Sequence, residues 1–510
     1  MVHLLVLLLS VVSGALCQKA PQVQTRNGSY TGIHLPLLNQ DYFLGMPFAQ
    51  PPVQGHLRFS PPASLNTSWT GSRDATQFGN ICYGYGVSED CLSINVVRPS
   101  NYTDQSLPVA VYIYGGGYFQ GGSADPRLNF SSIIRDSVTA EKPIIGVSFN
   151  YRLSAFGFLG GSELVAAGAA NLGFRDQRLA LHWNIAAFGG DPTKVTIFGN
   201  SAGAGSVGAQ LLAYNGRDDG LFRGAISQSG APAGFSPFSP FLDVAKWDEV
   251  YENITADTGC NTTDTLDCLR NVPIDVLNAV INSTATSGAS YGLDKRIRNN
   301  FDNATFYPTS KIDTDEQFSD YIVSLKANET VASRLFELYP QNAADQALAT
   351  YSGDLGAELG YQYKRAVTLA GDSNIIAPTR YTAQMWAAYN VPLYKYRWDV
   401  IVSGLPRYIG ATHAKEIFFV FNDQSRDDYD VWPLLDKPQS FSDLASIMAT
   451  AWANFVATGD PNSNGTVVNG TNWPLYNESK KNFVFTGNVS SHVEDDDTRE
   501  QEISFLSGLF

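Results

Sequence analysis

One serine in this sequence stands in a setting that suits nucleophilic catalysis. Ser201 is the centre of a Gly-x-Ser-x-Gly motif, which follows the apolar run 195–198 and precedes small residues that suit the start of a helix. A strand, turn and helix in this order form a strained turn that lifts the serine hydroxyl above the edge of a sheet. Ser201 is therefore the candidate nucleophile of an acyl-transfer reaction.

The same motif occurs a second time at Gly288–Gly292, with Ser290 at its centre. Ser, Thr and Asn dominate the residues before it, so we expect no strand there. A Gly-x-Ser-x-Gly motif without the strand and helix is a weak signal. We interpret the second copy as a loop.

The tetrahedral intermediate of acyl transfer carries negative charge on an oxygen and needs hydrogen-bond donors. Gly115–Gly117 come directly after the apolar run Pro108–Tyr114, which is typical of a buried strand. Because glycines have no Cβ atom, their N–H groups can approach a substrate oxygen closely. An ordinary glycine-rich turn is the alternative interpretation.

The general base can be sought among six histidines. One lies in an apolar leader, two precede the expected sheet, one lies in a helical pattern and one in an acidic tail: His3, His34, His56, His182 and His492. His413 remains, in a loop after the expected strand Pro392–Arg397. It also satisfies the order serine, acid, histidine that is usual for a nucleophile elbow.

Several longer motifs resemble those of the type-B carboxylesterase/lipase family, which includes cholinesterases and fungal lipases. They are EDCLSINV at 89–96, NYR at 150–152, DQRLAL at 176–181, FGGDP at 188–192 and TGDP at 458–461. The likeness covers nearly the whole chain after the leader. It implies an α/β-hydrolase fold with Ser201 as nucleophile and His413 as general base. It also implies oxyanion donors at the N–H groups of Gly116, Gly117 and Ala202.

The sequence departs from the family pattern at the third member of the triad. The matching segment is 299–306, where Asn303 aligns with the acid and also begins a glycosylation sequon. We expect the neighbouring Asp302 to act as the acid through a small shift of the backbone. Asp313 or Asp315 is an alternative, and so is a weak enzyme without the acid, since an Asp-to-Asn change in a serine protease triad lowers the rate about 10⁴-fold.

A second departure lies beside the nucleophile. Where the family usually has Glu, this chain has Asn200, and relatives often pair that Glu with another at the position of Glu416. Two buried carboxylates in contact would share a proton, whereas Asn200 can hydrogen-bond Glu416 without that conflict. We expect a less negative potential at the acyl site and no preference for choline esters. The alternative is that Asn200 only caps local backbone.

The first residues are typical of a signal peptide. Residues 1–17 contain a short apolar run followed by small residues, too short to span a bilayer. Residues 18–510 are then expected to form one domain. The four cysteines after the leader lie in close pairs that match paired positions in the family, Cys82 with Cys91 and Cys260 with Cys268. Such pairs suit an oxidising compartment.

A large α/β domain must position these residues. Strand-like runs at 143–151, 194–198, 223–227 and 392–397 alternate with helical patterns at 176–188, 201–212 and 441–457. This alternation predicts a mostly parallel central sheet with helices on both faces. The segment 236–390 is expected to form a helical cap and one wall of the active-site gorge.

Composition excludes some classes of partner. The net charge of −15 and the lack of a basic, aromatic-rich patch argue against nucleic-acid binding. No metal-ligand spacing or phosphate-binding loop is present, so we expect no metal and no cofactor. Thirteen Asn-x-Ser/Thr sequons favour a secreted surface with N-linked glycans, and no later segment suggests a membrane anchor.

The resemblance therefore implies a secreted serine ester hydrolase. In lipases of this family the first disulfide closes a long flap, but here it encloses only Tyr83–Asp90, which favours small or medium neutral esters. A lipase acting on long-chain acylglycerols is the alternative, and acyl transfer to another alcohol would use the same acyl-enzyme. Another alternative is a catalytically impaired extracellular binding or adhesion module of the same fold, since a fold does not determine function. The presence of Ser201, the glycine turn and His413 argues against this alternative.

Overall fold

The computed structural model describes residues 20–84, 87–102, 105–234, 244–261, 263–283, 311–325, 327–340, 360–405, 410–425, 429–462, 467, 470–487 and 491–510. Four of the features discussed above lie outside these residues: the expected signal peptide, the second Gly-x-Ser-x-Gly motif, Asp302 and Asn303. Their assignments stay predictions.

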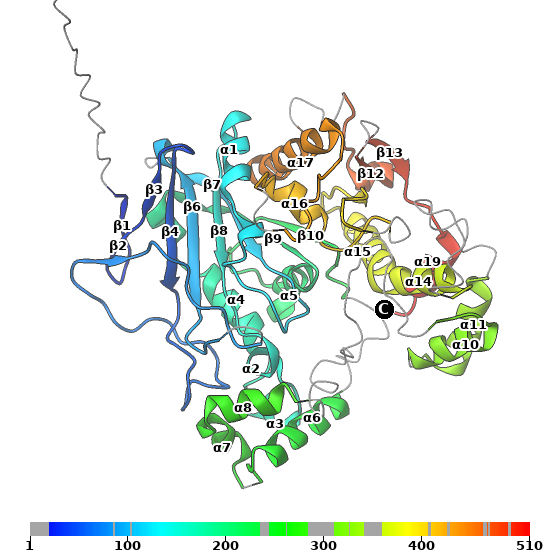
Figure 1. Cartoon of the computed structure of the whole chain (residues 1–510), viewed down its shortest axis with the longest axis horizontal. Helices are drawn as coiled ribbons and strands as arrows, with labels where there is room; N and C mark the ends of the chain where they lie inside the picture. The colour runs from blue at the N-terminus through cyan, green and yellow to red at the C-terminus, as the bar shows by residue number, and fades with distance from the viewer. Residues whose placement is uncertain are drawn as a thin grey trace, which may run out of the picture.

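A seven-stranded sheet lies at the centre of the molecule in the order β10-β9-β7-β8-β6-β4-β3 (Figure 1). The strands are β3 (Ile33–Leu35), β4 (Gln40–Pro47), β6 (Ser93–Pro99), β7 (Leu107–Ile113), β8 (Ile145–Phe149), β9 (Gly190–Asn200) and β10 (Gly224–Gln228). Both β6 and β8 are buried along their whole length, as expected for strands that are covered on both faces.

The sheet is mixed, which corrects the expectation of a mostly parallel one. Strands β7 to β10 pair in parallel, but β6, β4 and β3 are added in antiparallel fashion. The prediction rested on strands after residue 107, where helical crossovers produce parallel pairing. Before them, β3 and β4 are joined only by the turn 36–39, and a link this short can join only antiparallel neighbours.

Helices cover both faces of the sheet (Figure 1). Helices α4 (Leu172–Leu181) and α5 (Ala202–Gly216) lie on one face, and α1 (Ser131–Thr139), α16 (Glu416–Phe421) and α17 (Gln439–Thr458) on the other. The helix expected at 176–188 is interrupted, because Asn184 leaves the helical conformation before a separate 3₁₀ turn at Ile185–Phe188. In α5 the helical conformation is lost from Ala213 onward, close to the expected end at residue 212.

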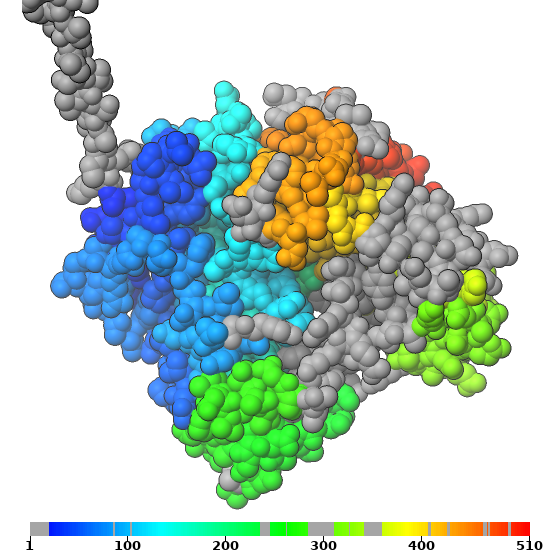
Figure 2. Space-filling model, viewed as in Figure 1, coloured from blue at the N-terminus to red at the C-terminus, as the bar shows by residue number. Residues whose placement is uncertain are grey.

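Two groups of helices pack beside the sheet. The first consists of α2 (Ser154–Phe158), α3 (Ser162–Ala166), α6 (Val244–Asp257), α7 (Thr265–Asn271) and α8 (Ile274–Ile281), which share one apolar cluster. The second contains α10 (Asp315–Ser324), α11 (Glu329–Leu338), α14 (Tyr363–Gly371) and α19 (Glu500–Ser507). Figure 2 shows α6 to α8 in bright green at the lower edge and α10 and α11 at the right. No helix in the described ranges is long and apolar enough to cross a membrane.

A separate three-stranded sheet consists of β11 (Tyr396–Asp399), β12 (Lys481–Thr486) and β13 (His492–Asp495). The strand expected at 392–397 begins only at Tyr396, and it pairs in parallel with β12. The loop after β11 leads to α16, and this loop carries His413.

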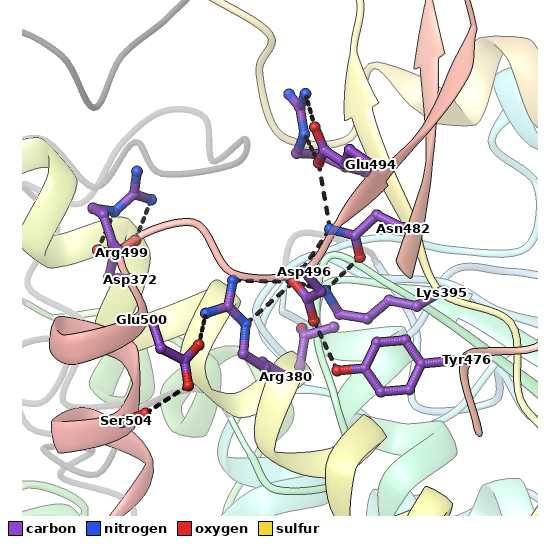
Figure 3. Close-up of polar contacts among 12 residues, drawn as sticks. Asp372, Arg380, Lys395, Tyr476, Asn482, Glu494, Asp496, Arg499, Glu500 and Ser504 are labelled. Carbon is purple, nitrogen blue, oxygen red and sulfur yellow. Dashed lines mark hydrogen bonds and ion pairs between the residues drawn. The ribbon is translucent and has the colours of Figure 1, made fainter. Parts of the chain in front are cut away.

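A buried ionic cluster joins this sheet to α15 (Ala377–Ala388) (Figure 3). The Asp496 carboxylate, which follows β13, accepts hydrogen bonds from Lys395 Nζ at 2.9 Å and from Arg380 Nε at 3.1 Å. The Tyr476 hydroxyl and the Asn482 amide donate to the same carboxylate. All five side chains are buried, so each charge depends on the others for its solvation.

Candidate active site

Ser201 lies at the turn between β9 and α5. Its φ of 57° and ψ of −125° are values that a residue other than glycine adopts only at an energetic cost. The Ser201 N–H donates to the carbonyl oxygen of Gln228 at 2.9 Å, and the Ser201 carbonyl accepts from the Gly205 N–H at 3.0 Å. The structure thus contains the strained turn that the motif predicts.

The glycines on either side of Ser201 permit close packing. A Cβ atom on Gly199 would lie 2.6 Å from the carbonyl carbon of Gly203, and one on Gly203 would lie 2.0 Å from the carbonyl oxygen of Ile113. Both distances are too short for any side chain. The Gly-x-Ser-x-Gly spacing therefore lets the start of α5 pack directly on the ends of β7 and β9.

The glycine turn after β7 lies against this elbow. A Cβ atom on Gly115 would be 3.0 Å from the Ser201 Cβ. Gly116 and Gly117 have φ values of 113° and 64°, which favour glycine. Ala202 is the first residue of α5, where backbone N–H groups have no partner within the helix. The turn that contains Gly116 and Gly117 therefore meets the elbow at Gly115, and Ala202 directly follows Ser201. The donor role of Gly116, Gly117 and Ala202 stays a prediction.

His413 lies in the loop between β11 and α16, three residues before the buried Glu416. Burial lowers the pKa of the His413 imidazole to about 3. The ring is therefore neutral at neutral pH, which is the state that a general base requires. A carboxylate partner would raise this pKa, because it would stabilise the imidazolium form.

The side chain before the nucleophile contacts the start of α16. The Asn200 amide donates to Glu416 Oε1, as expected from the sequence. The Gln228 amide lies 3.5 Å from the same oxygen, and Trp452 Nε1 donates to Gln228 Oε1 at 3.3 Å. These contacts connect the elbow to the segment that carries His413. An amide, rather than a second carboxylate, therefore lies next to the nucleophile.

Burial raises the pKa of Glu416 to about 7, although the hydrogen bonds from Asn200 and Gln228 oppose this shift. The folded state holds the Glu416 proton more tightly than the unfolded chain does, so protonation of Glu416 stabilises the fold. This stabilisation is complete below the ordinary glutamate pKa. It is lost as the pH rises through about 7.

Glu416→Gln is therefore expected to flatten the dependence of stability on pH. Relative to the variant, the wild type should lose on the order of 3 kcal/mol of unfolding free energy between about pH 4 and pH 8. Urea unfolding midpoints at several pH values measure this difference. Glu337→Gln on the exposed side of α11 is the control and should follow the wild type. Parallel curves for Glu416→Gln and wild type would contradict the expectation.

Two carboxylates considered as alternative triad acids have local partners. Asp315 accepts from Arg365 Nη1 and from the Gln362 amide, each at 2.9 Å. Asp313 accepts from the Tyr361 N–H at 2.9 Å. These contacts tie both residues to the start of α14 and the residues just before it, which disfavours either of them as the partner of His413.

The charged residues of the family motifs near the elbow form ion pairs. Arg152 and Asp176 are both buried and lie 2.7 Å apart, and Arg178 pairs with Asp219 at 2.6 Å.

Both expected disulfides, Cys82–Cys91 and Cys260–Cys268, are present. The loop closed by the first one is also held by an ion pair, because Glu89 accepts from Arg58 Nε and Nη2, each at 2.6 Å. Arg58 is buried, so this end of the loop is fixed to the body of the protein.

Sequence reasoning missed Gln228, whose carbonyl holds the backbone of Ser201. It is the last residue of β10, and only the parallel pairing of β10 with β9 places it opposite Asn200. No local motif marks it.

Comparisons with known proteins identify the family of this chain. The chain matches the model of the Carboxylesterase family over residues 19–346 and 297–506. It is 33% identical to Lipase 4 of Diutina rugosa, over 91% of this chain and 90% of that protein. It is 32% identical to Secreted lipase 1 of Botryotinia fuckeliana (strain B05.10), over 89% and 87% of the two chains.

A solved structure shares the fold. The crystal structure of Aspergillus niger EstA superposes with a TM-score of 0.78 at 27% sequence identity, covering 96% of this chain and 98% of that one. The predicted α/β-hydrolase fold is therefore confirmed. The chain belongs to the carboxylesterase family and is a serine carboxylic ester hydrolase.

Proposed function

We propose that this protein is a secreted esterase that hydrolyses small and medium neutral esters through an acyl-enzyme on Ser201. His413 takes the proton of the Ser201 hydroxyl while the Ser201 Oγ attacks the ester carbonyl carbon. The negative oxygen of the tetrahedral intermediate is held by the N–H groups of Gly116, Gly117 and Ala202. His413 then protonates the leaving alcohol, and a water molecule activated by His413 hydrolyses the acyl-enzyme.

The observation that carries this mechanism is the position of the strained Ser201 turn. It contacts the Gly115–Gly117 turn at Gly115 and lies immediately before the first residue of α5. Asp302 is the proposed triad acid that orients His413. Since the imidazole is neutral in the folded protein, it is ready to accept a proton.

The preference for small and medium esters is supported by the first disulfide loop. The loop is short, and the Arg58–Glu89 ion pair ties it down, so it is poorly suited to act as a long flap that opens over a large acyl chain. Neutral substrates are supported by Asn200, since an amide replaces a potential negative charge beside Ser201. Secretion is supported by the two disulfides and by the name of the relative Secreted lipase 1.

A lipase acting on long-chain acylglycerols is the second candidate. Two relatives that share about nine-tenths of the chain are named lipases. The two candidates differ in the acyl chain that each prefers.

Steady-state hydrolysis of p-nitrophenyl acetate, butyrate and palmitate tests the proposal, with butyrylthiocholine as a cationic ester. We expect kcat/KM for butyrate to exceed that for palmitate at least about tenfold, since a tenfold ratio needs only about 1.4 kcal/mol of differential transition-state binding. Butyrylthiocholine should be no better than the neutral butyrate. A preference for palmitate would favour the lipase, and the absence of turnover on all esters would contradict the catalytic mechanism.

A further inference from the structure

The glycine turn after β7 is closed by hydrogen bonds to one of its own carbonyl groups. The Gly116 carbonyl accepts from the Phe119 N–H at 3.2 Å and from the Gln120 N–H at 3.1 Å. In a trans peptide the carbonyl and the N–H group point in opposite directions, and the described residues contain no cis peptide bond. The Gly117 N–H belongs to the same peptide as the Gly116 carbonyl, so these two hydrogen bonds set its direction.

The loop that the Cys82–Cys91 disulfide closes contacts this turn at Phe119. A Cβ atom on Gly84 would lie 2.2 Å from the Phe119 carbonyl oxygen and 3.1 Å from the Phe119 carbonyl carbon. The Gly84 backbone therefore packs directly on the Phe119 backbone. The Phe119 ring lies against Gly117, because a Cβ atom on Gly117 would lie 2.5 Å from the ring Cε1. Phe119 thus contacts both the disulfide loop and a candidate oxyanion donor.

The disulfide loop is held in place at several points besides its disulfide. Glu89 accepts two hydrogen bonds of 2.6 Å from the buried Arg58. The Tyr83 N–H donates to the Ser88 carbonyl at 3.1 Å within the loop. The Tyr83 ring packs against Phe156 of α2, with ring centroids 5.6 Å apart. Because the loop is anchored in this way, it can restrain the turn that it contacts.

We propose that the disulfide loop supports the oxyanion site, and that Gly84 is the positioning residue through which this support acts. Gly84 limits the position of Phe119, and the Phe119 N–H holds the peptide that carries the Gly117 N–H. The inference rests on the proposed function, since it assigns a support to the same donors. Oxyanion donors must lie within about 2.7–3.1 Å of the charged oxygen to be effective. A displaced donor weakens binding of the transition state more than binding of the uncharged ester, so kcat falls more than KM rises.

Gly84→Ala tests this role, because the added Cβ atom collides with the Phe119 carbonyl oxygen while the loop is anchored. We expect kcat for p-nitrophenyl butyrate to fall about tenfold, with KM changed less than about twofold. An alkyl trifluoromethyl ketone measures the oxyanion site itself, because the Ser201 Oγ adds to its carbonyl carbon and the carbonyl oxygen becomes negative. Its inhibition constant should rise about tenfold in Gly84→Ala, in parallel with the loss of kcat.

The matched control is Gly259→Ala beside the second disulfide. Gly259 has a φ of 74°, and a Cβ atom there would meet no atom of the described residues within 4 Å. The Gly84 φ of 151° also favours glycine, so both variants strain the backbone but only Gly84→Ala adds a collision with the turn. Gly259→Ala should therefore keep the kcat of the wild type.

Removal of each disulfide tests the support independently. Cys82→Ser/Cys91→Ser releases the loop and should lower kcat at least about threefold. Cys260→Ser/Cys268→Ser removes the other disulfide and should leave kcat unchanged. Gly84→Ala should cost little more once the loop is released, because both changes act through the same contact.

Three results would overturn the proposal while the wild type remains an active esterase. They are a wild-type kcat in Gly84→Ala, a loss expressed through KM alone with unchanged binding of the ketone, and an equal loss of kcat in Gly259→Ala. An inert wild type would instead overturn the proposed function.

Discussion

Replacement of Ser201 by alanine should lower kcat for p-nitrophenyl butyrate by about 10⁵- to 10⁶-fold, because the variant lacks the nucleophile that forms the acyl-enzyme. The fold should be retained, since the hydrogen bonds of the turn use the backbone N–H and carbonyl of Ser201 rather than its hydroxyl. Stopped-flow measurement should show a burst of p-nitrophenol in the wild type if deacylation limits turnover. In Ser201→Ala no burst is expected.

Ser290→Ala is the matched control, because it alters the central serine of the second Gly-x-Ser-x-Gly motif. This variant should hydrolyse esters at the wild-type rate. The assignment of the nucleophile would be wrong if Ser290→Ala were inactive and Ser201→Ala remained active. Circular dichroism of both variants separates a loss of chemistry from a loss of fold.

Asp302→Asn should lower kcat/KM about 10³- to 10⁴-fold, because an amide in place of the triad acid favours the wrong tautomer of His413 and cannot stabilise its protonated form. The shape of the side chain is nearly unchanged, so a large effect would be electrostatic. Rates on p-nitrophenyl butyrate, measured against pH, give both the size of the loss and any shift in the apparent pKa of the base.

Asn303→Ala is the comparison for Asp302→Asn, since residue 303 is the one that aligns with the family's acid. It should keep kcat/KM within about threefold of the wild type, because an amide side chain cannot act as the triad acid. It also removes a glycosylation sequon, so Thr305→Ala, which removes the same sequon, separates a glycan effect from a side-chain effect. Wild-type activity in Asp302→Asn would show that another group orients His413.

The elbow and its surroundings were predictable because they depend on short sequence spacings. The glycines at 199 and 203 are required by contacts within a few residues or with the adjacent strand end, and such requirements leave a motif. The Asn200–Glu416 contact was predictable only through the family resemblance, since the two residues are 216 positions apart.

Other features depend on how distant segments pair. The antiparallel side of the sheet follows from the hairpin of β3 and β4, which the alternation of later strands and helices could not reveal. The place of Gln228 depends on the register of β10 against β9.

The ionic cluster around Asp496 also constrains when this part of the chain can fold during synthesis. Arg380 and Lys395 are buried with Asp496 as their shared anionic partner, more than 100 residues later in the chain. Asp372 is likewise buried against Arg499 (Figure 3). Because burying a charge without its partner is strongly unfavourable, α15 and β11 cannot reach their native packing until residues 496–499 have left the ribosome. The part of the chain that contains α15 and β11 is therefore expected to complete its folding only once residue 499 is available, while the N-terminal strands can pair earlier.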